Sequence, residues 1–103
     1  MRVISQKLRD SARDESCTLR LIGCLNGNET VVLCHASGTG MKGTGMKAPD
    51  HFAMYGCQNC HDIIDGRKGI HGQHWDYRDI VRAVCETQMR MIEKGLIIIK
   101  GMK

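Results

Sequence analysis

The residues with the clearest capacity for chemistry are two pairs of cysteines and the histidine that follows one of them. Cys57 and Cys60 are separated by two residues, and His61 comes directly after Cys60. Upstream, six residues lie between Cys17 and Cys24. Thiolates from two short loops are a usual tetrahedral ligand set for structural zinc in a small intracellular domain. The spacing therefore predicts a closed Zn²⁺ site made by Cys17, Cys24, Cys57 and Cys60.

Two further cysteines fall outside this set. Cys34 lies in a β-branched and apolar run, directly before His35. Because successive side chains of a strand point to opposite faces, we expect Cys34 to face the core and His35 to face away from it. Cys85 falls on the apolar side of an expected helix. We interpret it as a small buried hydrophobic residue, which is common for a free cysteine.

The histidines predict a second site that is open to solvent. If Cys60 begins a helix, His61 lies in its first turn, and Asp65, four residues later, shares the same face. An imidazole and a carboxylate at this spacing can hold one divalent cation and leave positions for water and a phosphate. The alternative is a simple hydrogen bond on the helix surface. A neutral histidine can accept a proton from water near neutral pH, and we assign this role to His35.

A small α+β domain must position these side chains. Glycine-rich residues 38–47 form a direct five-residue repeat without apolar periodicity, which predicts a loop. β-branched and aromatic runs on either side of this loop predict two antiparallel strands, at residues 30–36 and 51–56. Apolar spacing and glycine stops predict helices at residues 4–15, 57–65 and 75–94. The order predicts a zinc-stapled ββα core with an N-terminal helix and a long C-terminal helix.

Length and composition favour one domain that spans residues 1–103. The chain has only one Trp, one Phe and two Tyr, so its apolar core should be small. A domain of this size buries a limited fraction of its surface, and a metal staple would add stability. The first residues contain no apolar signal segment, and no run reaches membrane-spanning length. We therefore expect a cytoplasmic protein with no membrane association, in which the cysteines stay reduced.

The net charge of +4 suggests an acidic partner such as DNA. The basic residues nearest the expected site lie in the glycine-rich loop and after the Cys-His motif; they are Lys42, Lys47, Arg67 and Lys68. Surface charges that only solvate the protein are an equally good interpretation.

Taken together, these motifs resemble a known arrangement. A histidine at a strand end, a glycine-rich loop and a Cys-x-x-Cys-His sequence that opens a helix are similar to the zinc-stapled HNH endonucleases, whose fold is the ββα-metal motif. More closely, residues 13–65 resemble the small prophage-encoded nucleases of the YbcO type. The segments that carry the resemblance are Cys17, residues 23–28, His35, residues 43–45, residues 49–50 and residues 57–65.

The resemblance implies a metal-dependent endonuclease that hydrolyses DNA phosphodiester bonds. It gives His35 the role of general base and His61 that of a ligand to a single catalytic cation, Mg²⁺ or another divalent ion. Asp50 stands where HNH enzymes have their central Asn, and its side chain would orient the loop or the His35 ring. Cys34 stands where these enzymes usually carry an Asp or His ligand, and Asp65 would compensate for that loss.

Two other functions remain open from the sequence. One is a non-catalytic, zinc-stabilised DNA-binding accessory protein of a phage or prophage. The other is a Cys-x-x-Cys redox protein, which is less favoured because no βαβ pattern precedes the motif. Only the nuclease requires His35 and His61 to converge. The oligomeric state does not follow from these patterns.

Overall fold

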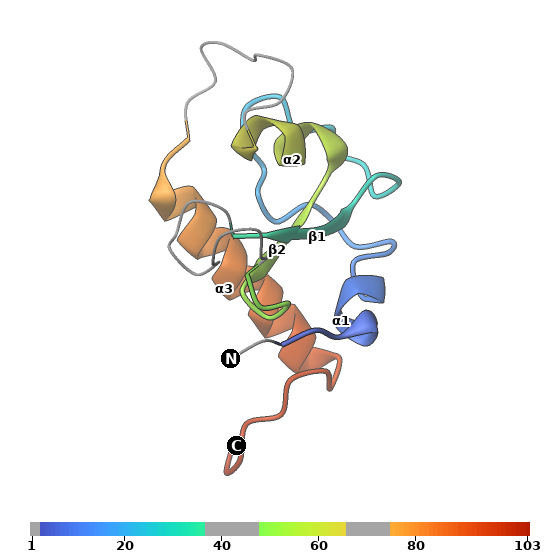
Figure 1. Cartoon of the computed structure of the whole chain (residues 1–103), viewed down its shortest axis with the longest axis vertical. Coiled ribbons are helices and arrows are strands. Elements are labelled where there is room, and N and C mark those ends of the chain that lie inside the picture. The colour runs from blue at the N-terminus through green and yellow to red at the C-terminus, as the bar shows by residue number, and fades with distance from the viewer. Residues whose placement is uncertain (1–2, 37–47, 66–74) are drawn as a thin grey trace.

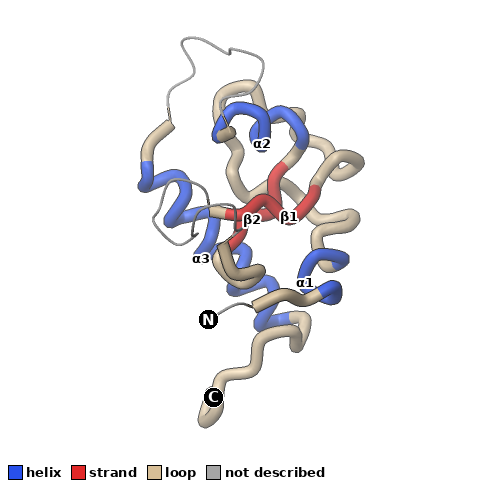
Figure 2. The backbone as a smooth tube through the Cα atoms, in the orientation of Figure 1, coloured by secondary structure: helices blue, strands red, loops and turns tan. Residues whose placement is uncertain are grey.

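The computed structural model describes residues 3–36, 48–65 and 75–103. In chain order, the elements are α1 (Gln6–Asp10), β1 (Val32–His35), β2 (Ala53–Gly56), α2 (Gln58–Ile64) and α3 (Tyr77–Glu93). Figure 1 shows α2 at one end of the molecule and α3 running diagonally past the strands, with α1 on the side of β1. Figure 2 shows the two short strands in the middle of this arrangement. The described residues thus form the expected α+β architecture. None of their helices has the length and apolar character needed to cross a membrane.

The two strands pair antiparallel, as predicted, but both are shorter than the sequence patterns indicated. Their register places Val32 opposite Gly56 and Cys34 opposite Met54. Cys34 is fully buried, whereas its neighbour His35 keeps part of its surface exposed. The predicted core position of Cys34 is therefore confirmed. A Cβ added at Gly56 would lie 2.6 Å from Cys34 Sγ, so the close approach of β2 to this thiol requires a glycine.

Strand β2 leads directly into α2 through one cysteine. Cys57 caps the helix: its backbone is extended, and its sulfur accepts a hydrogen bond from the Cys60 amide at 3.4 Å. A side-chain acceptor at this position satisfies an amide that has no partner within the helix. The predicted short helix is confirmed, and its first turn carries Cys60 and His61.

Helix α3 begins with a capping box formed by Asp76 and Asp79. It ends before Gly95, whose φ of +75° is the left-handed conformation that favours glycine after a helix. The predicted extent of this helix is confirmed to within two residues at each end. The face that packs into the core carries Ile80, Ala83, Thr87 and Met91.

Two interpretations of the helices are wrong. Cys85 is exposed, because it lies about 200° around the helix from the buried Ala83. Helix α1 covers only Gln6–Asp10 instead of residues 4–15. A turn follows it, and Asp14 adopts a positive φ of 62°, which an α-helix does not contain. Leu8 lies on the buried face of α1, in agreement with its helical spacing, but Ile4 is exposed.

Candidate functional site

The four predicted zinc ligands converge at one point. The sulfur atoms of Cys17, Cys24, Cys57 and Cys60 all lie within 4.8 Å of one another, and those of Cys24 and Cys57 are 3.8 Å apart. Zinc bound to four sulfurs at about 2.3 Å would place neighbouring sulfurs about 3.8 Å apart. The size and chemistry of this donor set fit a tetrahedral metal ion. The cluster can therefore hold a metal such as zinc.

Local backbone geometry brings the first two cysteines into this cluster. Gly23 and Asn26 adopt positive φ values of 97° and 59°, and Arg20 also does so at 46°. The amides of Arg20 and Cys57 donate hydrogen bonds to Cys17 Sγ at 3.5 and 3.4 Å. Such N–H···S bonds stabilise a thiolate where it meets a metal. These turns and hydrogen bonds bend the chain around the four sulfur atoms.

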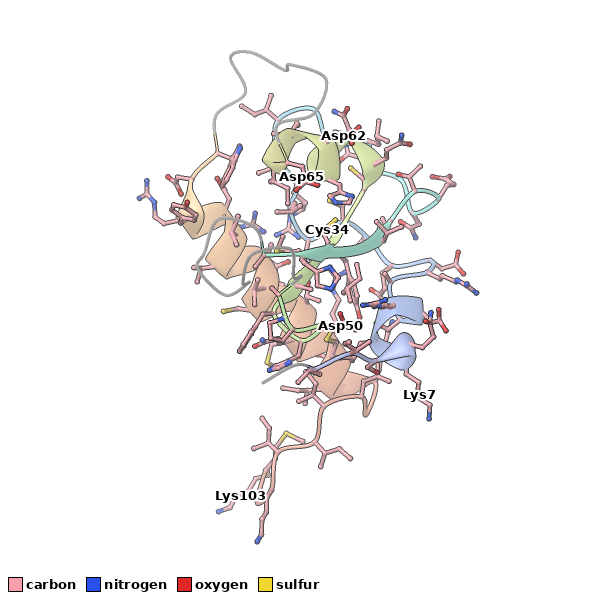
Figure 3. The ribbon with its side chains drawn as sticks, in the orientation of Figure 1. Lys7, Cys34, Asp50, Asp62, Asp65 and Lys103 are labelled. Carbon is pink, nitrogen blue, oxygen red and sulfur yellow. The ribbon has the colours of Figure 1, made fainter. Side chains whose placement is uncertain are left out.

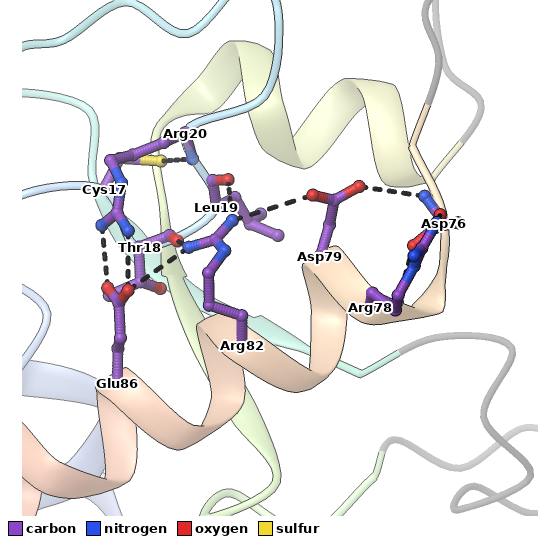
Figure 4. Close-up of polar contacts among 9 residues, drawn as sticks. All are labelled: Cys17, Thr18, Leu19, Arg20, Asp76, Arg78, Asp79, Arg82 and Glu86. Atoms are coloured by element: carbon purple, nitrogen blue, oxygen red, sulfur yellow. Dashed lines mark hydrogen bonds and ion pairs between the residues drawn. The ribbon is translucent and has the colours of Figure 1, made fainter.

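Two arginines connect residues 17–24, which we call the cluster segment, to helix α3 (Figure 4). Arg82 donates to the carbonyls of Thr18 and Leu19 at 2.7 Å each. Arg20 pairs with Glu86 through two hydrogen bonds of 2.8 and 2.6 Å. Arg20, which has a positive φ, thus contacts a side chain 66 residues away in sequence. Spacing along the chain gave no signal for this contact.

The thiols of Cys17, Cys24 and Cys60 differ in the direction in which their pKa is shifted. A hydrogen bond from Cys60 is the largest influence on the pKa of Cys17 and lowers it to about 4, although burial opposes the shift. The same hydrogen bond raises the pKa of Cys60, while burial raises the pKa of Cys24. One thiolate therefore disfavours ionisation of its neighbours. A divalent cation removes this conflict, because it binds all four sulfurs as thiolates.

A second set of contacts surrounds His35. Its Nε2 lies 2.7 Å from Oδ1 of Asp50, whose side chain is only 2% exposed. The other carboxylate oxygen of Asp50 accepts hydrogen bonds from the Ser5 amide at 2.7 Å and from Arg9 Nε at 3.0 Å. Burial alone would raise the pKa of Asp50, but the hydrogen bonds from His35, Ser5 and Arg9 outweigh it and lower that pKa. Asp50 is therefore an ionised acceptor at neutral pH.

This charge state fixes the tautomer of the neutral imidazole. An ionised carboxylate can only accept hydrogen bonds, so the ring proton of His35 must lie on Nε2. Nδ1 is then the nitrogen with a lone pair. The sequence placed Asp50 beside His35 only through the family resemblance, and the structure brings the two side chains into contact.

His35 lines an open pocket of about 280 Å³ between α1 and β1. The residues around the pocket come from both elements and from the segments next to them; they are Arg9, Asp10, Ala12, Arg13, Val31, Val32, Leu33 and His35. Sequence reasoning missed the two arginines. Their only signal was the four-residue separation that puts Arg9 and Arg13 on one side of a helical turn.

The second histidine belongs to a different pair. His61 Nε2 lies 3.0 Å from Asp65 Oδ2, and both side chains are partly exposed. The predicted shared face is therefore confirmed.

Cys34 lies between Asp65 and Asp50 in the view of Figure 3. Burial raises the pKa of its thiol, and the nearby charge of Asp65 raises it further, so Cys34 is a neutral thiol in the core.

The predicted residues of the open site, His35, Asp50, His61 and Asp65, do not form one metal-binding group. Among residues 3–36, 48–65 and 75–103, the cysteine cluster is the sole set of three or more His, Cys, Asp or Glu side chains close enough to share a metal. The two histidines are instead held in the pairs His35–Asp50 and His61–Asp65. The proposed DNA contacts Lys42, Lys47, Arg67 and Lys68 lie outside the described residues.

Known proteins are similar to this chain in sequence and in fold. Residues 6–96 match the family described as "Putative nuclease YbcO". Proteins with that name from Escherichia coli K12 and Enterobacteria phage 82 are each 38% identical over 91 residues, which cover 87% of this chain and 95% of the relative. A solved structure, titled as a "putative bacteriophage protein" from E. coli K-12, aligns with a TM-score of 0.63 and 29% identity. The alignment covers 86% of this chain and all of the other.

Proposed function

The chain belongs to the YbcO family, and from this premise we propose that it is a metal-dependent endonuclease that hydrolyses phosphodiester bonds of DNA. The relatives carry the name of a nuclease, which makes a nucleic acid the substrate class. The observation that carries the proposal is the 2.7 Å contact between His35 and the buried Asp50 at the wall of an open pocket. A buried, ionised carboxylate that orients an imidazole at a pocket wall is the arrangement that a general base requires.

In this reaction, His35 is the general base. Asp50 holds the Nε2–H, so Nδ1 is the atom that takes a proton from the attacking water. The carboxylate then stabilises the imidazolium that results, as a carboxylate does for the histidine of a hydrolase triad. The carboxylate thus sets both the orientation of the ring and the nitrogen that reacts.

The catalytic cation is assigned to His61 and Asp65. Their ligand atoms are already 3.0 Å apart on one face of α2, and both side chains are accessible from solvent. Mg²⁺ is usually bound through one or two carboxylates and keeps several waters, so Asp65 meets its requirement, whereas the imidazole of His61 suits a transition ion such as Ni²⁺. When bound, such a cation supplies positive charge to the phosphate and to the leaving oxygen.

Structural zinc on the four cysteines completes the proposal. Cys60 and His61 are adjacent, and Cys57 joins β2 to α2, so the metal would fix the start of the helix that presents His61. Two antiparallel strands followed directly by a helix, with candidate residues at the end of β1 and the start of α2, support an HNH-type ββα-metal arrangement.

Plasmid nicking tests the function. Purified zinc-loaded protein is incubated with supercoiled plasmid and Mg²⁺, Mn²⁺ or Ni²⁺, beside His35→Ala and the control Cys85→Ser. We expect the wild type and the control to nick equally and His35→Ala to lose about 100-fold or more of the rate. Equal nicking by His35→Ala would sink the proposed base. DNA binding without nicking under every cation would favour the accessory DNA-binding protein.

A further inference from the structure

Asp50 carries a carboxylate that is buried in the described part of the chain. Its carboxylate is ionised and 2% exposed, and burying an unpaired charge is strongly unfavourable. Water cannot compensate for that cost here, so protein donors must. The identity of those donors decides how firmly Asp50, and with it His35, is held.

The donors come from the N-terminal segment. Oδ2 of Asp50 accepts from the Ser5 amide and from Arg9 Nε, and Arg9 Nη2 lies 3.4 Å from Oδ1. Among the residues that the structure describes, Arg9 is the arginine or lysine that forms an ion pair with Asp50. Ser5 also caps α1, since its hydroxyl oxygen accepts from the Leu8 amide at 3.2 Å. Ser5 therefore both caps α1 and donates its amide to Asp50, and Arg9 reaches Asp50 from the same helix.

We propose that Arg9 is a positioning residue for the reaction: its guanidinium holds the Asp50 carboxylate in the orientation that fixes the His35 ring. This inference rests on the proposed nuclease function. Arg9 approaches Asp50 side-on, through Nε and Nη2, which is a geometry that restricts rotation of a carboxylate. Lysine offers a point charge without the fork, so it can replace the charge of Arg9 but not this geometry.

Removal of the guanidinium has a defined consequence. The Asp50 carboxylate would keep its hydrogen bonds with the Ser5 amide and His35, but it would lose the contact with the positive guanidinium. The carboxylate would then rotate or take up a proton. Either change loosens the hydrogen bond that selects the His35 tautomer. A neutral amide at position 50 would not need the guanidinium. The effect of removing Arg9 must therefore depend on the charge of residue 50.

A double-mutant cycle tests this dependence. The zinc-loaded variants Arg9→Gln, Arg9→Lys, Asp50→Asn and Arg9→Gln/Asp50→Asn are assayed for plasmid nicking across pH. Arg78→Gln is the matched control, since the Arg78 side chain is 94% exposed and pairs with Asp76 at the start of its own helix. We expect Arg9→Gln to lower kcat about tenfold with KM nearly unchanged, and Arg9→Lys to restore part of the loss. In the Asp50→Asn background, Arg9→Gln should change kcat less than about twofold.

An equal loss in both backgrounds, or wild-type kcat and pH profile in Arg9→Gln, would overturn the inference. A ¹⁵N NMR measurement of the His35 tautomer separates this result from failure of the nuclease itself. If the wild type nicks no DNA but Arg9→Gln shifts the tautomer away from Nε2–H, the function is wrong and the positioning role stands. If Arg9→Gln leaves an active enzyme with an unchanged tautomer, the positioning role is wrong. Arg9→Lys provides the same readout should Arg9→Gln fail to fold.

Discussion

The cysteine cluster and the His35 site are constructed in opposite ways. The cluster takes its four ligands from two short segments, and each pair of cysteines is close in sequence. The His35 site is assembled from contacts that span 15 residues to Asp50 and a further 41 residues from Asp50 to Arg9. The cluster is mostly buried, whereas His35 lines a pocket that is open to solvent.

This difference separates stability from chemistry. A metal bound by the cluster would stabilise the junction of β2 and α2, because Cys57 and Cys60 lie on either side of it. The contacts around Asp50 orient one ring and contribute less to the fold. Damage to the cluster should therefore unfold the protein, while damage around Asp50 should leave a folded protein with altered chemistry.

Loss of the metal should have the largest effect. Structural zinc in small peptides contributes about 10–16 kcal/mol, which rivals the total stability of about 5–15 kcal/mol for an ordinary domain. We expect Cys57→Ser, or chelation of the wild type, to abolish cooperative thermal unfolding, with zinc content measured alongside. Cys85→Ser should retain the wild-type Tm because Cys85 is exposed and outside the cluster. A wild-type Tm in zinc-free Cys57→Ser would show that the cluster is not the staple.

The arginine contacts between the cluster segment and α3 should have an intermediate effect. Arg82→Ala removes the donors that serve the carbonyls of Thr18 and Leu19, and we expect a loss of about 1–2 kcal/mol. Urea denaturation measures it. The control Arg78→Ala removes an exposed ion pair, which contributes little to stability because solvent screens it. Equal losses in the two variants would mean that α3 does not support the cluster through Arg82.

The pH dependence of stability should carry the smallest effect. The folded-state pKa of Asp50 lies below its ordinary value. Its ionised form therefore stabilises the protein above the unfolded-state pKa of about 3.9, and this contribution is lost as the pH falls through the folded-state pKa. We expect Asp50→Asn to be less stable than the wild type at pH 7, with the difference narrowing towards pH 3. Unfolding curves at several pH values measure it, and a constant difference would contradict a paired carboxylate.

The sequence alone identified the elements and the four thiols. Helix α3, the antiparallel strands and the short helix after Cys57 follow from periods and stops within a few residues, and such local signals need no tertiary information. The spacing of Cys57 and Cys60 is a local signal of the same kind. Helix α1 was overestimated because Leu8 and Ala12 are spaced as in a helix, although the helix ends at Asp10 and a turn with a positive φ at Asp14 follows it.

Only the tertiary structure decided which side chains meet across the molecule. Arg9 reaches Asp50, Arg82 reaches the cluster segment, and Cys85 faces outward because the buried stripe of α3 runs through Ala83 and Thr87. A charged side chain gives no periodic signal of its partner, since the pair forms wherever packing brings opposite charges together. The ligands of the cluster could therefore be inferred from spacing, whereas the support of His35 could be recognised only when α1 was placed against β1.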